Sequence, residues 1–474
     1  MQSVQTQEAT AEPAEQALYE VRNKIHPRAV SGKFALSRWF FVWATQLVFY
    51  GLPWLSWNDR QAVLFDLVHR KFYIFGLVFW PQDIVYLSVL LIISAYSLFL
   101  FTAVGGRLWC GYACPQTVYT EIFMWIERRI EGDRMKRMKL DKASLNVRKV
   151  VIKAAKHGAW IAVALWTGFT FVGYFTPITE LAGKVLNWSM GPWERFWVFF
   201  YAFATYGNAG WMREQVCKYM CPYARFQSAM FDRDTLIISY DQERGEPRGS
   251  RSKRADYKAR GLGDCVDCGI CVQVCPTGID IRNGLQYECI GCAACIDGCN
   301  QVMDKMGYPR GLVRYSSENA LENHLDFAGM IRRVVRPRIL IYTAVLWTII
   351  IVAAFALTNR VPVKVDVIRD RITMVAPDDP VVENVYRLQV MNTSEIPRQF
   401  RISASGLDGI ELESQTQPIF IDGASQRVIP VRLRADKRQT RPGANRVLFT
   451  VETVGGDEQI VIEEDATFIT PRSE

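Results

Sequence analysis

The chain has 474 residues, of which 50% are hydrophobic and 22% charged, and its formal net charge is +8. This length suggests about three domains, and the composition indicates a membrane part joined to soluble parts, which excludes a transporter that lies entirely in the membrane. The positive charge does not indicate nucleic-acid binding, because the basic residues flank apolar segments instead of forming one stripe.

The segment 1–35 is predicted to be a disordered cytoplasmic N-terminus. Residues 1–20 are polar and acidic and include Pro and Ala, a composition that cannot bury a core. They lack the pattern of a secretory signal peptide.

Five segments are long and apolar enough to cross a bilayer core of about 30 Å. They are 36–57, 84–104, 159–176, 193–211 and 339–357. The first four belong to a predicted membrane domain over residues 36–240, and the fifth stands alone near the C-terminal part of the chain.

The basic residues predict the orientation of these spans. The segment 105–158 carries twelve Lys or Arg, whereas 178–192 carries only Lys184. Because Lys and Arg are enriched in cytoplasmic loops, the segments 105–158 and 213–338 are predicted to lie in the cytoplasm. The chain after residue 357 then lies on the opposite side of the membrane.

A short cysteine motif, C-x-Y-x-C-P, follows the second and the fourth predicted spans. Its two copies are Cys110-Gly-Tyr112-Ala-Cys114-Pro115 and Cys217-Lys-Tyr219-Met-Cys221-Pro222. Two spans followed by the motif form an internal repeat, and such repeats in membrane proteins often meet around a shared site. Because proline suits the first turn of a helix, Cys114 and Cys221 are predicted at helix starts, where the helix dipole favours a thiolate.

Three interpretations of these four cysteines stay open. Single buried cysteines usually behave as small apolar side chains, although the duplicated motif favours a functional site. Thiolates, with a thioether from Met212 or Met220, select soft ions such as Cu(I). A third iron–sulfur cluster is the chemical competitor of copper.

The segment 241–335 is predicted to be a cytoplasmic ferredoxin module, because its eight cysteines have the spacing of a two-cluster bacterial ferredoxin. The runs are Cys265-x2-Cys268-x2-Cys271-x3-Cys275-Pro276 and Cys289-x2-Cys292-x2-Cys295-x3-Cys299. In such a protein each run supplies three thiolates to one [4Fe–4S] cluster and its last thiolate to the other cluster. One cluster is therefore predicted on Cys265, Cys268, Cys271 and Cys299, and the other on Cys275, Cys289, Cys292 and Cys295.

Zinc binding and disulfides are the alternatives for these eight cysteines. Zinc sites also use paired CxxC runs, but they rarely repeat the longer CxxCxxCxxxC pattern. Dense disulfides belong to short secreted chains. The spacing therefore favours iron–sulfur clusters and electron transfer.

The segment 360–474 has a different character. Short alternating runs at 363–368, 386–391, 400–404, 427–434, 446–454 and 459–462 are separated by turn residues such as Pro442-Gly443. This pattern predicts an immunoglobulin-like β-sandwich on the periplasmic side. The segment contains no Cys and no His, so we expect a binding or docking module without a redox site.

In this order of motifs the chain resembles the FixG/RdxA-like accessory proteins of the cbb3-type cytochrome c oxidase, which are polyferredoxins of the bacterial inner membrane. The resemblance covers nearly all of the chain after the N-terminal segment. It rests on the two C-x-Y-x-C-P motifs, the two ferredoxin runs, Phe79-Trp80-Pro81-Gln82-Asp83, Arg244-Gly-Glu-Pro-Arg248 and Val302-Met303-Asp304-Lys305-Met306-Gly307. We therefore expect a multi-domain protein with an α-helical membrane bundle of about five spans, a two-cluster ferredoxin-like module and a C-terminal immunoglobulin-like β-sandwich.

The resemblance implies a role in maturing a haem–copper oxidase, with reduction of Cu(II) to Cu(I) as the chemistry. Cys110, Cys114, Cys217 and Cys221 would bind copper or relay electrons to it. The expected partners are the membrane, a copper chaperone, oxidase subunits or assembly factors, and a cytoplasmic electron donor. Two other functions stay open, namely an electron conduit between a cytoplasmic donor and membrane quinone, and a non-enzymatic assembly scaffold.

Overall fold

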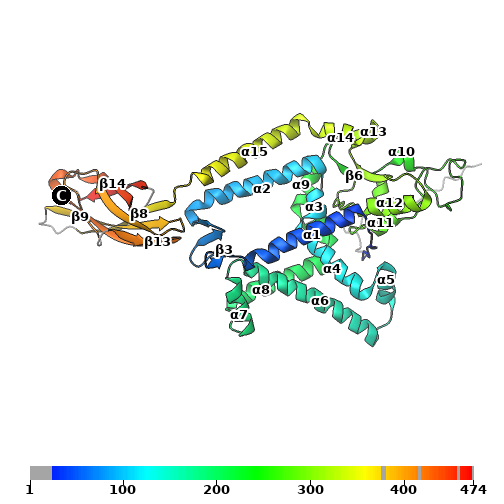
Figure 1. Ribbon diagram of the computed structural model, residues 1–474, viewed down its shortest axis with the longest axis horizontal. Coiled ribbons are helices and arrows are strands. Elements are labelled where there is room, and N and C mark those ends of the chain that lie inside the picture. The colour runs from blue at the N-terminus through cyan, green and yellow to red at the C-terminus, as the bar shows by residue number, and fades with distance from the viewer. Residues whose placement is uncertain (1–23, 375–379, 415–417, 456–458, 472–474) are drawn as a thin grey trace, which may run out of the picture.

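The computed structural model describes residues 24–374, 380–414, 418–455 and 459–471. The molecule is elongated, with a β-sandwich at one end, long helices in the middle and the cysteine-rich module at the other end (Figure 1). The long helices therefore lie between two chemically different domains.

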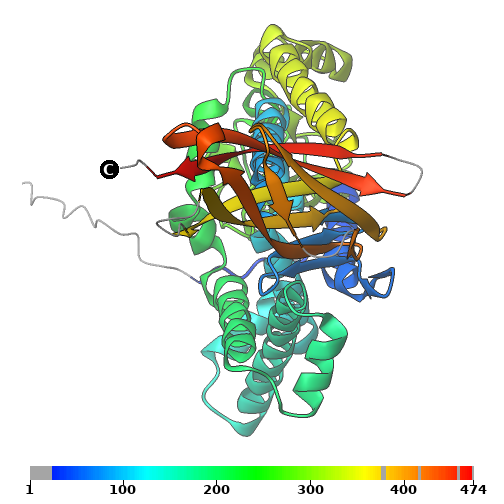
Figure 2. The same cartoon turned by 90° about the vertical axis from the view of Figure 1, so that its left-hand side faces the viewer.

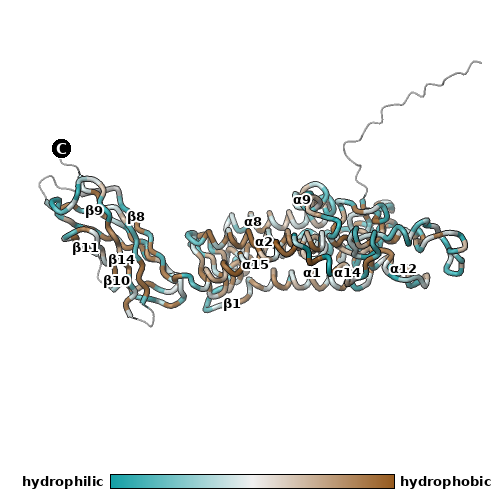
Figure 3. The backbone as a smooth tube through the Cα atoms, turned by 90° about the horizontal axis from the view of Figure 1, so that it is seen from above, coloured by the Kyte–Doolittle hydropathy of each residue, from teal (hydrophilic) through white to brown (hydrophobic). Residues whose placement is uncertain are grey.

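Five long helices correspond to the expected spans. They are α1 (Lys33–Gly51), α2 (Ile84–Gly105), α6 (Val147–Val172), α8 (Pro192–Thr205) and α15 (Pro337–Thr358). The helices α2 and α15 run side by side (Figure 1), and the Tyr86 hydroxyl donates to the carbonyl of Ala356 at 3.2 Å. Within the described residues, the helices over Pro81–Gly105 and Pro337–Thr358 are the two that are long and apolar enough to cross a membrane. Both show as hydrophobic in Figure 3.

The first expected span is wrong at its C-terminal end, because the helix stops at Gly51. Pro53, which has no N–H to donate, lies in the short helix η1 (Leu52–Trp54), and hairpin strands follow. The fourth expected span continues beyond α8 as the π-helix η3 (Tyr206–Met212). The hairpin strands are β1 (Ser56–Trp57), β2 (Arg60–Gln61), β3 (Val63–Asp66), β4 (Lys71–Ile74) and β5 (Leu77–Phe79).

The same order of elements follows each half of the repeat. After α2 come α3 (Leu108–Tyr112) and α4 (Pro115–Glu131), and after η3 come η4 (Val216–Met220) and α9 (Pro222–Met230). In both halves a proline occupies the first turn of the second helix. The remaining helices of this region are η2 (Pro81–Asp83), α5 (Arg134–Lys142) and α7 (Ile178–Leu186).

The cysteine-rich module has few regular elements. Strands β6 (Ile237–Tyr240) and β7 (Val313–Ser316) pair antiparallel, and Ile281, Ile296, Met303 and Leu312 are buried with Cys265 in its core. Its helices are α10 (Gln242–Gly245), α11 (Ile270–Gln273), η5 (Ile281–Asn283), α12 (Ala294–Met306), α13 (Glu318–Glu322) and α14 (Phe327–Val334).

The expected disorder of the N-terminal segment is wrong from Lys24 onward, and residues 1–23 lie outside the described residues. The Arg28 amide donates to the carbonyl of Gln273 at 2.8 Å, and the Ala29 amide donates to Asp133 at 3.2 Å. Asp297 of α12 then accepts a hydrogen bond of 2.8 Å from the Ala35 amide, in the first turn of α1. These bonds join residues 24–35 to the module and to α5.

The C-terminal β-sandwich consists of two antiparallel four-stranded sheets, with strand orders β12-β10-β14-β15 and β11-β13-β9-β8 (Figure 2). Tyr386, Leu388, Phe400, Phe449 and Phe468 are fully buried between them. The strands are β8 (Val363–Met374), β9 (Val381–Asn392), β10 (Arg398–Ser405), β11 (Glu411–Glu413), β12 (Ile419–Ile421), β13 (Ser425–Asp436), β14 (Gly443–Val454) and β15 (Val461–Thr470), with the short helix η6 (Lys437–Gln439) before β14. Five expected strands lie within these bounds, but the expected strand 459–462 is misplaced, because β15 begins at Val461.

The sandwich is fastened to the helical part. The buried carboxylate of Asp83 pairs with Arg360 at 2.6 Å and also with Lys364. Val78 in β5 and Trp80, which directly follows this strand, pack on Met391 of β9. The Phe79–Asp83 stretch therefore joins the hairpin, α2 and the sandwich.

Candidate functional site

The eight ferredoxin-type cysteines line two small adjacent cavities. Cys265, Cys268 and Cys271 of the first run line one cavity together with Cys299 of the second run. Cys289, Cys292 and Cys295 of the second run line the other with Cys275, and Cys271 lies between the two. Each cavity is thus lined by three cysteines of one run and the last cysteine of the other, and Cys271 borders both cavities.

The two cysteine loops have the same backbone conformation. Asp267 and Gly269 in the first loop, and Gly291 and Ala293 in the second, have positive φ angles between 51° and 69°. Non-glycine residues such as Asp267 and Ala293 rarely adopt this conformation. Turns of this kind direct backbone N–H groups toward one point, where they bind anions.

The thiols at both cavities are strongly desolvated. Burial raises the pKa of Cys289 and of Cys299 to about 12, and that of Cys271 to about 11. Thiolates at these positions therefore require a positive charge close by, which a bound metal would supply. The sulfur donor set suits iron or zinc, and in the described part of the chain no three His, Cys, Asp or Glu side chains are placed to hold one metal ion together.

The four cysteines of the C-x-Y-x-C-P motifs occupy matching places in the two halves. Cys114 immediately precedes α4 and Cys221 immediately precedes α9, both with extended backbone, so they lie at the predicted helix starts. Cys110 lies in α3 and Cys217 in the π-helix η4. Burial raises the pKa of the Cys114 thiol, although the backbone amides of Gln116 and Thr117 act to lower it.

These four thiols lie within electrostatic reach of one another. Burial, followed by the neighbouring Cys114, raises the pKa of Cys110 to about 12, and the same two causes raise that of Cys217 to about 11. The Cys110 thiol donates to the side-chain oxygen Oε1 of Gln227 at 3.4 Å. Gln227 is fully buried, and its side-chain nitrogen Nε2 has no hydrogen-bond partner. Met220, one of the two expected thioether ligands, is 57% exposed.

The four-cysteine site touches the second ferredoxin cavity. Cys110 and Cys217 both pack on a buried cluster that contains Ile290 and Cys292. Cys217 and Cys292 also line one narrow pocket. Sequence spacing did not predict this contact, since the two motifs and the second run are far apart along the chain.

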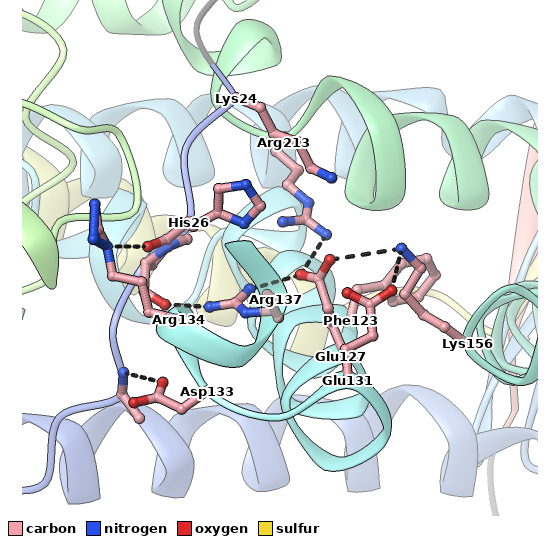
Figure 4. A network of polar contacts seen from close by, with 12 residues as sticks. Lys24, His26, Phe123, Glu127, Glu131, Asp133, Arg134, Arg137, Lys156 and Arg213 are labelled. Atoms are coloured by element: carbon pink, nitrogen blue, oxygen red, sulfur yellow. Dashed lines mark hydrogen bonds and ion pairs between the residues drawn. The ribbon is translucent and has the colours of Figure 1, made fainter. Parts of the chain in front are cut away.

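A buried ionic network, also not predicted, lies beside this site (Figure 4). Glu127 pairs with Arg137 at 2.9 Å, with Arg213 at 3.0 Å and with Lys156 at 3.7 Å. Next to it is a cavity of about 420 Å³, whose lining includes Lys153, Lys156, His157, Trp160, Trp211 and Arg213. Arg213 and Glu214 also line the pocket of Cys217, so the two spaces are neighbours.

Comparison with protein families identifies three matching domains. A 4Fe-4S binding domain matches residues 87–132, which include Cys110 and Cys114. A 4Fe-4S dicluster domain matches residues 212–318, which include the remaining ten cysteines. The domain described as an IG-like fold at the C-terminal of FixG, putative oxidoreductase, matches residues 353–471 and confirms the predicted immunoglobulin-like class.

Two curated proteins are similar over most of their length. Protein RdxA of Cereibacter sphaeroides is 38% identical over 431 residues, which cover 88% of each chain. Nitrogen fixation protein FixG of Rhizobium meliloti is 39% identical over 418 residues, which cover 81% of this chain and 79% of FixG. The crystal structure of a FixG-related protein from Vibrio parahaemolyticus is 23% identical, covers 23% of this chain and 96% of its own, and has a TM-score of 0.20.

Proposed function

Because the chain belongs to the family of FixG and RdxA and is an iron–sulfur electron-transfer protein, we propose that its eight ferredoxin-type cysteines bind two [4Fe–4S] clusters. Cys265, Cys268, Cys271 and Cys299 hold the first, and Cys275, Cys289, Cys292 and Cys295 hold the second. The division of these residues between two cavities supports the assignment. When bound, such clusters accept and release single electrons.

The contact between the four-cysteine site and the second cavity carries the proposed direction of electron transfer. Cys268 is exposed at the first cavity, where a cytoplasmic donor has access. Cys110 and Cys217 lie against the second cavity. Electrons therefore enter near Cys268, pass to the second cavity and leave through the four-cysteine site.

The proposed final acceptor is Cu(II), which takes one electron and becomes Cu(I). Cys110, Cys114, Cys217 and Cys221 bind the copper, because thiolates favour Cu(I) over harder ions. The product would pass to a copper chaperone for assembly of a cbb3-type cytochrome c oxidase, and other oxidase assembly factors are the proposed partners of the sandwich.

The proposed location is the bacterial inner membrane, crossed by α1, α2, α6, α8 and α15. Large apolar side chains on α1, α6 and α8 are exposed in the protein, which suits contact with lipid. They include Phe40, Trp43, Leu165, Trp166, Phe199 and Phe203.

Anaerobic turnover tests the copper proposal. Protein kept reduced with dithionite, then freed of it, should convert Cu(II) to chelated Cu(I). Replacing Cys110, Cys114, Cys217 or Cys221 by Ser should lower this conversion while the iron content stays unchanged. Met220→Leu, which removes an exposed thioether between two of these cysteines, is the matched control and should have no effect.

Unchanged copper reduction in all four serine variants would refute the assignment of the site. Iron beyond the amount that two clusters need, lost in Cys110→Ser, would instead identify a third cluster at the four cysteines.

Membrane quinone is a second candidate acceptor, favoured by the cavity beside the ionic network. His157 stacks on Trp211 with ring centroids 5.7 Å apart, and its Nδ1 lies 3.0 Å from the Tyr206 hydroxyl. A quinone ring suits the aromatic walls of the cavity, and Lys156 offers a hydrogen-bond donor. Reduction of a short-chain quinone without copper, lowered in His157→Phe, would support this candidate.

A further inference from the structure

Two arginines are buried against the second ferredoxin loop. Arg38 of α1 donates from Nη1 to the carbonyl of Cys292 at 3.1 Å. Arg107, which precedes α3, donates from Nη1 to the carbonyls of Cys289, at 3.1 Å, and Tyr287, and from Nη2 to that of Ala224 at 2.7 Å. Their exposed fractions are 8% and 7%.

The charges of these two arginines are not neutralised by a direct ion pair, although Glu121 acts electrostatically on Arg38. All of these hydrogen bonds go to neutral carbonyl groups, and among the described residues neither guanidinium forms an ion pair with a carboxylate. Arg38 Nε is buried without any partner. The buried cations Arg137 and Lys156, by contrast, pair with Glu127 and Glu131. A buried charge without a counter-charge is costly, which indicates that an anion belongs beside Arg38 and Arg107.

The first ferredoxin cavity has a different electrostatic environment. Arg282, near Cys271, is neutralised by Asp280 at 2.7 Å and Asp267 at 2.5 Å. Arg251 donates to the Cys265 carbonyl at 3.2 Å, but it is only partly buried, so solvent screens its charge. The two cavities therefore differ in buried positive charge that lacks a direct ion pair.

A buried positive charge beside an iron–sulfur cluster changes the reduction potential of that cluster. Four thiolates make an iron–sulfur cubane a net anion, and reduction adds one more negative charge. A nearby buried cation stabilises the reduced form more than the oxidised form. Arg107 lies within electrostatic reach of Cys289, Cys110 and Cys217, and Arg38 within reach of Cys292.

We propose that Arg38 and Arg107 raise the reduction potential of the cluster held by Cys275, Cys289, Cys292 and Cys295. Electron transfer toward the four-cysteine site is thereby favoured. The inference rests on the proposed cluster assignment. The step is a one-electron exchange, in which the cluster nearer Cys268 is oxidised and the one nearer Arg107 is reduced, with the first electron supplied by a cytoplasmic one-electron donor.

A redox titration of the full-length protein, followed by electron paramagnetic resonance, tests this proposal without copper. Arg38→Gln and Arg107→Gln should each disfavour reduction of the same cluster at least tenfold, which is a downward shift of 59 mV for one electron. Arg38→Lys and Arg107→Lys keep the charge and should largely restore the potential, whereas loss of packing alone would not be rescued in this way.

Arg251→Gln is the matched control, since Arg251 makes the same kind of contact at the first cavity. This variant should slightly shift the midpoint potential of the cluster at the first cavity. It should leave the midpoint potential of the cluster at the second cavity unchanged. Glu121→Gln supplies an opposite test if the arginine variants do not fold. Glu121 acts electrostatically on Arg38 and on Cys292, so its loss should raise the midpoint that the arginine variants lower.

Midpoints that stay unchanged in the glutamine variants, or in Glu121→Gln, would overturn the proposal. A shift of the same midpoint by Arg251→Gln would also overturn it. Absence of two iron–sulfur signals from the unmodified protein would instead refute the cluster assignment, so the two failures are distinguishable.

Discussion

Gly111 lies where the first C-x-Y-x-C-P motif meets the second ferredoxin loop. A Cβ at this position would come 2.7 Å from the carbonyl oxygen of Gly291 and 3.0 Å from the Cα of Cys292. The corresponding residue of the second motif is Lys218. The two motifs therefore differ because the backbone of the first approaches the module so closely that only glycine fits.

Gly111→Ala should separate the four-cysteine site from the second cavity. We expect electron transfer to the final acceptor to slow by roughly tenfold to a hundredfold, because small displacements of reacting groups have effects of this size. Iron content and cluster absorbance should stay unchanged. Gly158→Ala, at a position with no atoms within 4 Å of the added Cβ, is the control. Equal rates in both variants would contradict the proposed path.

Glu127 holds three cationic side chains together in the buried network of Figure 4. Glu127→Gln should lower the free energy of unfolding by about 3–5 kcal/mol, since it leaves buried cations without their counter-charge. Chemical denaturation of the detergent-solubilised protein measures this loss. Asp465→Asn, at an exposed ion pair with Arg446, should change stability little; a comparable loss in both variants would argue against the network's importance.

Because of Glu127, we also expect the protein to lose stability in acid. Burial acts to raise the pKa of Glu127, but Arg213, Arg137 and Lys156 outweigh it, so the pKa is lowered. A carboxyl with a lowered pKa in the folded state contributes stability above its unfolded value of about 4.3, and this contribution is lost as the pH falls through the folded value. Stability of the unmodified protein should therefore fall below about pH 4.3, and Glu127→Gln should show a shallower fall.

At the scale of elements, sequence patterns predicted the helix starts and strands that depend on neighbouring residues in the chain. The prolines after Cys114 and Cys221 placed both cysteines at helix starts, and alternation of apolar residues placed β8, β9, β10, β13 and β14. Pro53 carried a signal for the end of α1, but the apolar residues around it obscured that signal. The short strands β11 and β12 have too few residues for a visible alternation.

Contacts between distant segments could not be predicted in this way. The fastening of residues 24–35 depends on partners such as Gln273 and Asp297, and no pattern within the segment itself reveals them. The approach of Cys110 and Cys217 to Cys292 is likewise a tertiary feature. Gly111 was the one local signal for it, and its meaning is clear only from the fold.

Removal of iron should loosen the cysteine-rich module and the segment fastened to it. Four cysteines lie in or against the module's apolar core, and few regular elements support that core. Hydrogen exchange should therefore rise across 262–306 and at residues 28–35 after chelation, while β9 and β13 of the sandwich stay protected. Exchange that rises equally in the sandwich, or nowhere, would contradict this account.

At the scale of the whole molecule, α2 and α15 separate the cysteine-rich module from the sandwich (Figure 1). The enrichment of Lys and Arg predicts that the segment 105–158 lies in the cytoplasm, and the sandwich is then predicted to be periplasmic. Ser403 of β10 is exposed, so a membrane-impermeant maleimide should label Ser403→Cys in intact cells. Lys253→Cys, exposed on the module, should be labelled only after lysis. Labelling of Lys253→Cys in intact cells would reverse the orientation.

The most direct test of the central claim is anaerobic rapid mixing of the reduced protein with limiting Cu(II) and a Cu(I) chelator. Reoxidation of the iron–sulfur absorbance should match the appearance of chelated Cu(I) one for one, and both should slow together in a Cys110→Ser/Cys217→Ser double variant that retains its iron. Reoxidation that is equally fast in both proteins would contradict the account, because copper would then take electrons from the clusters without the four-cysteine site.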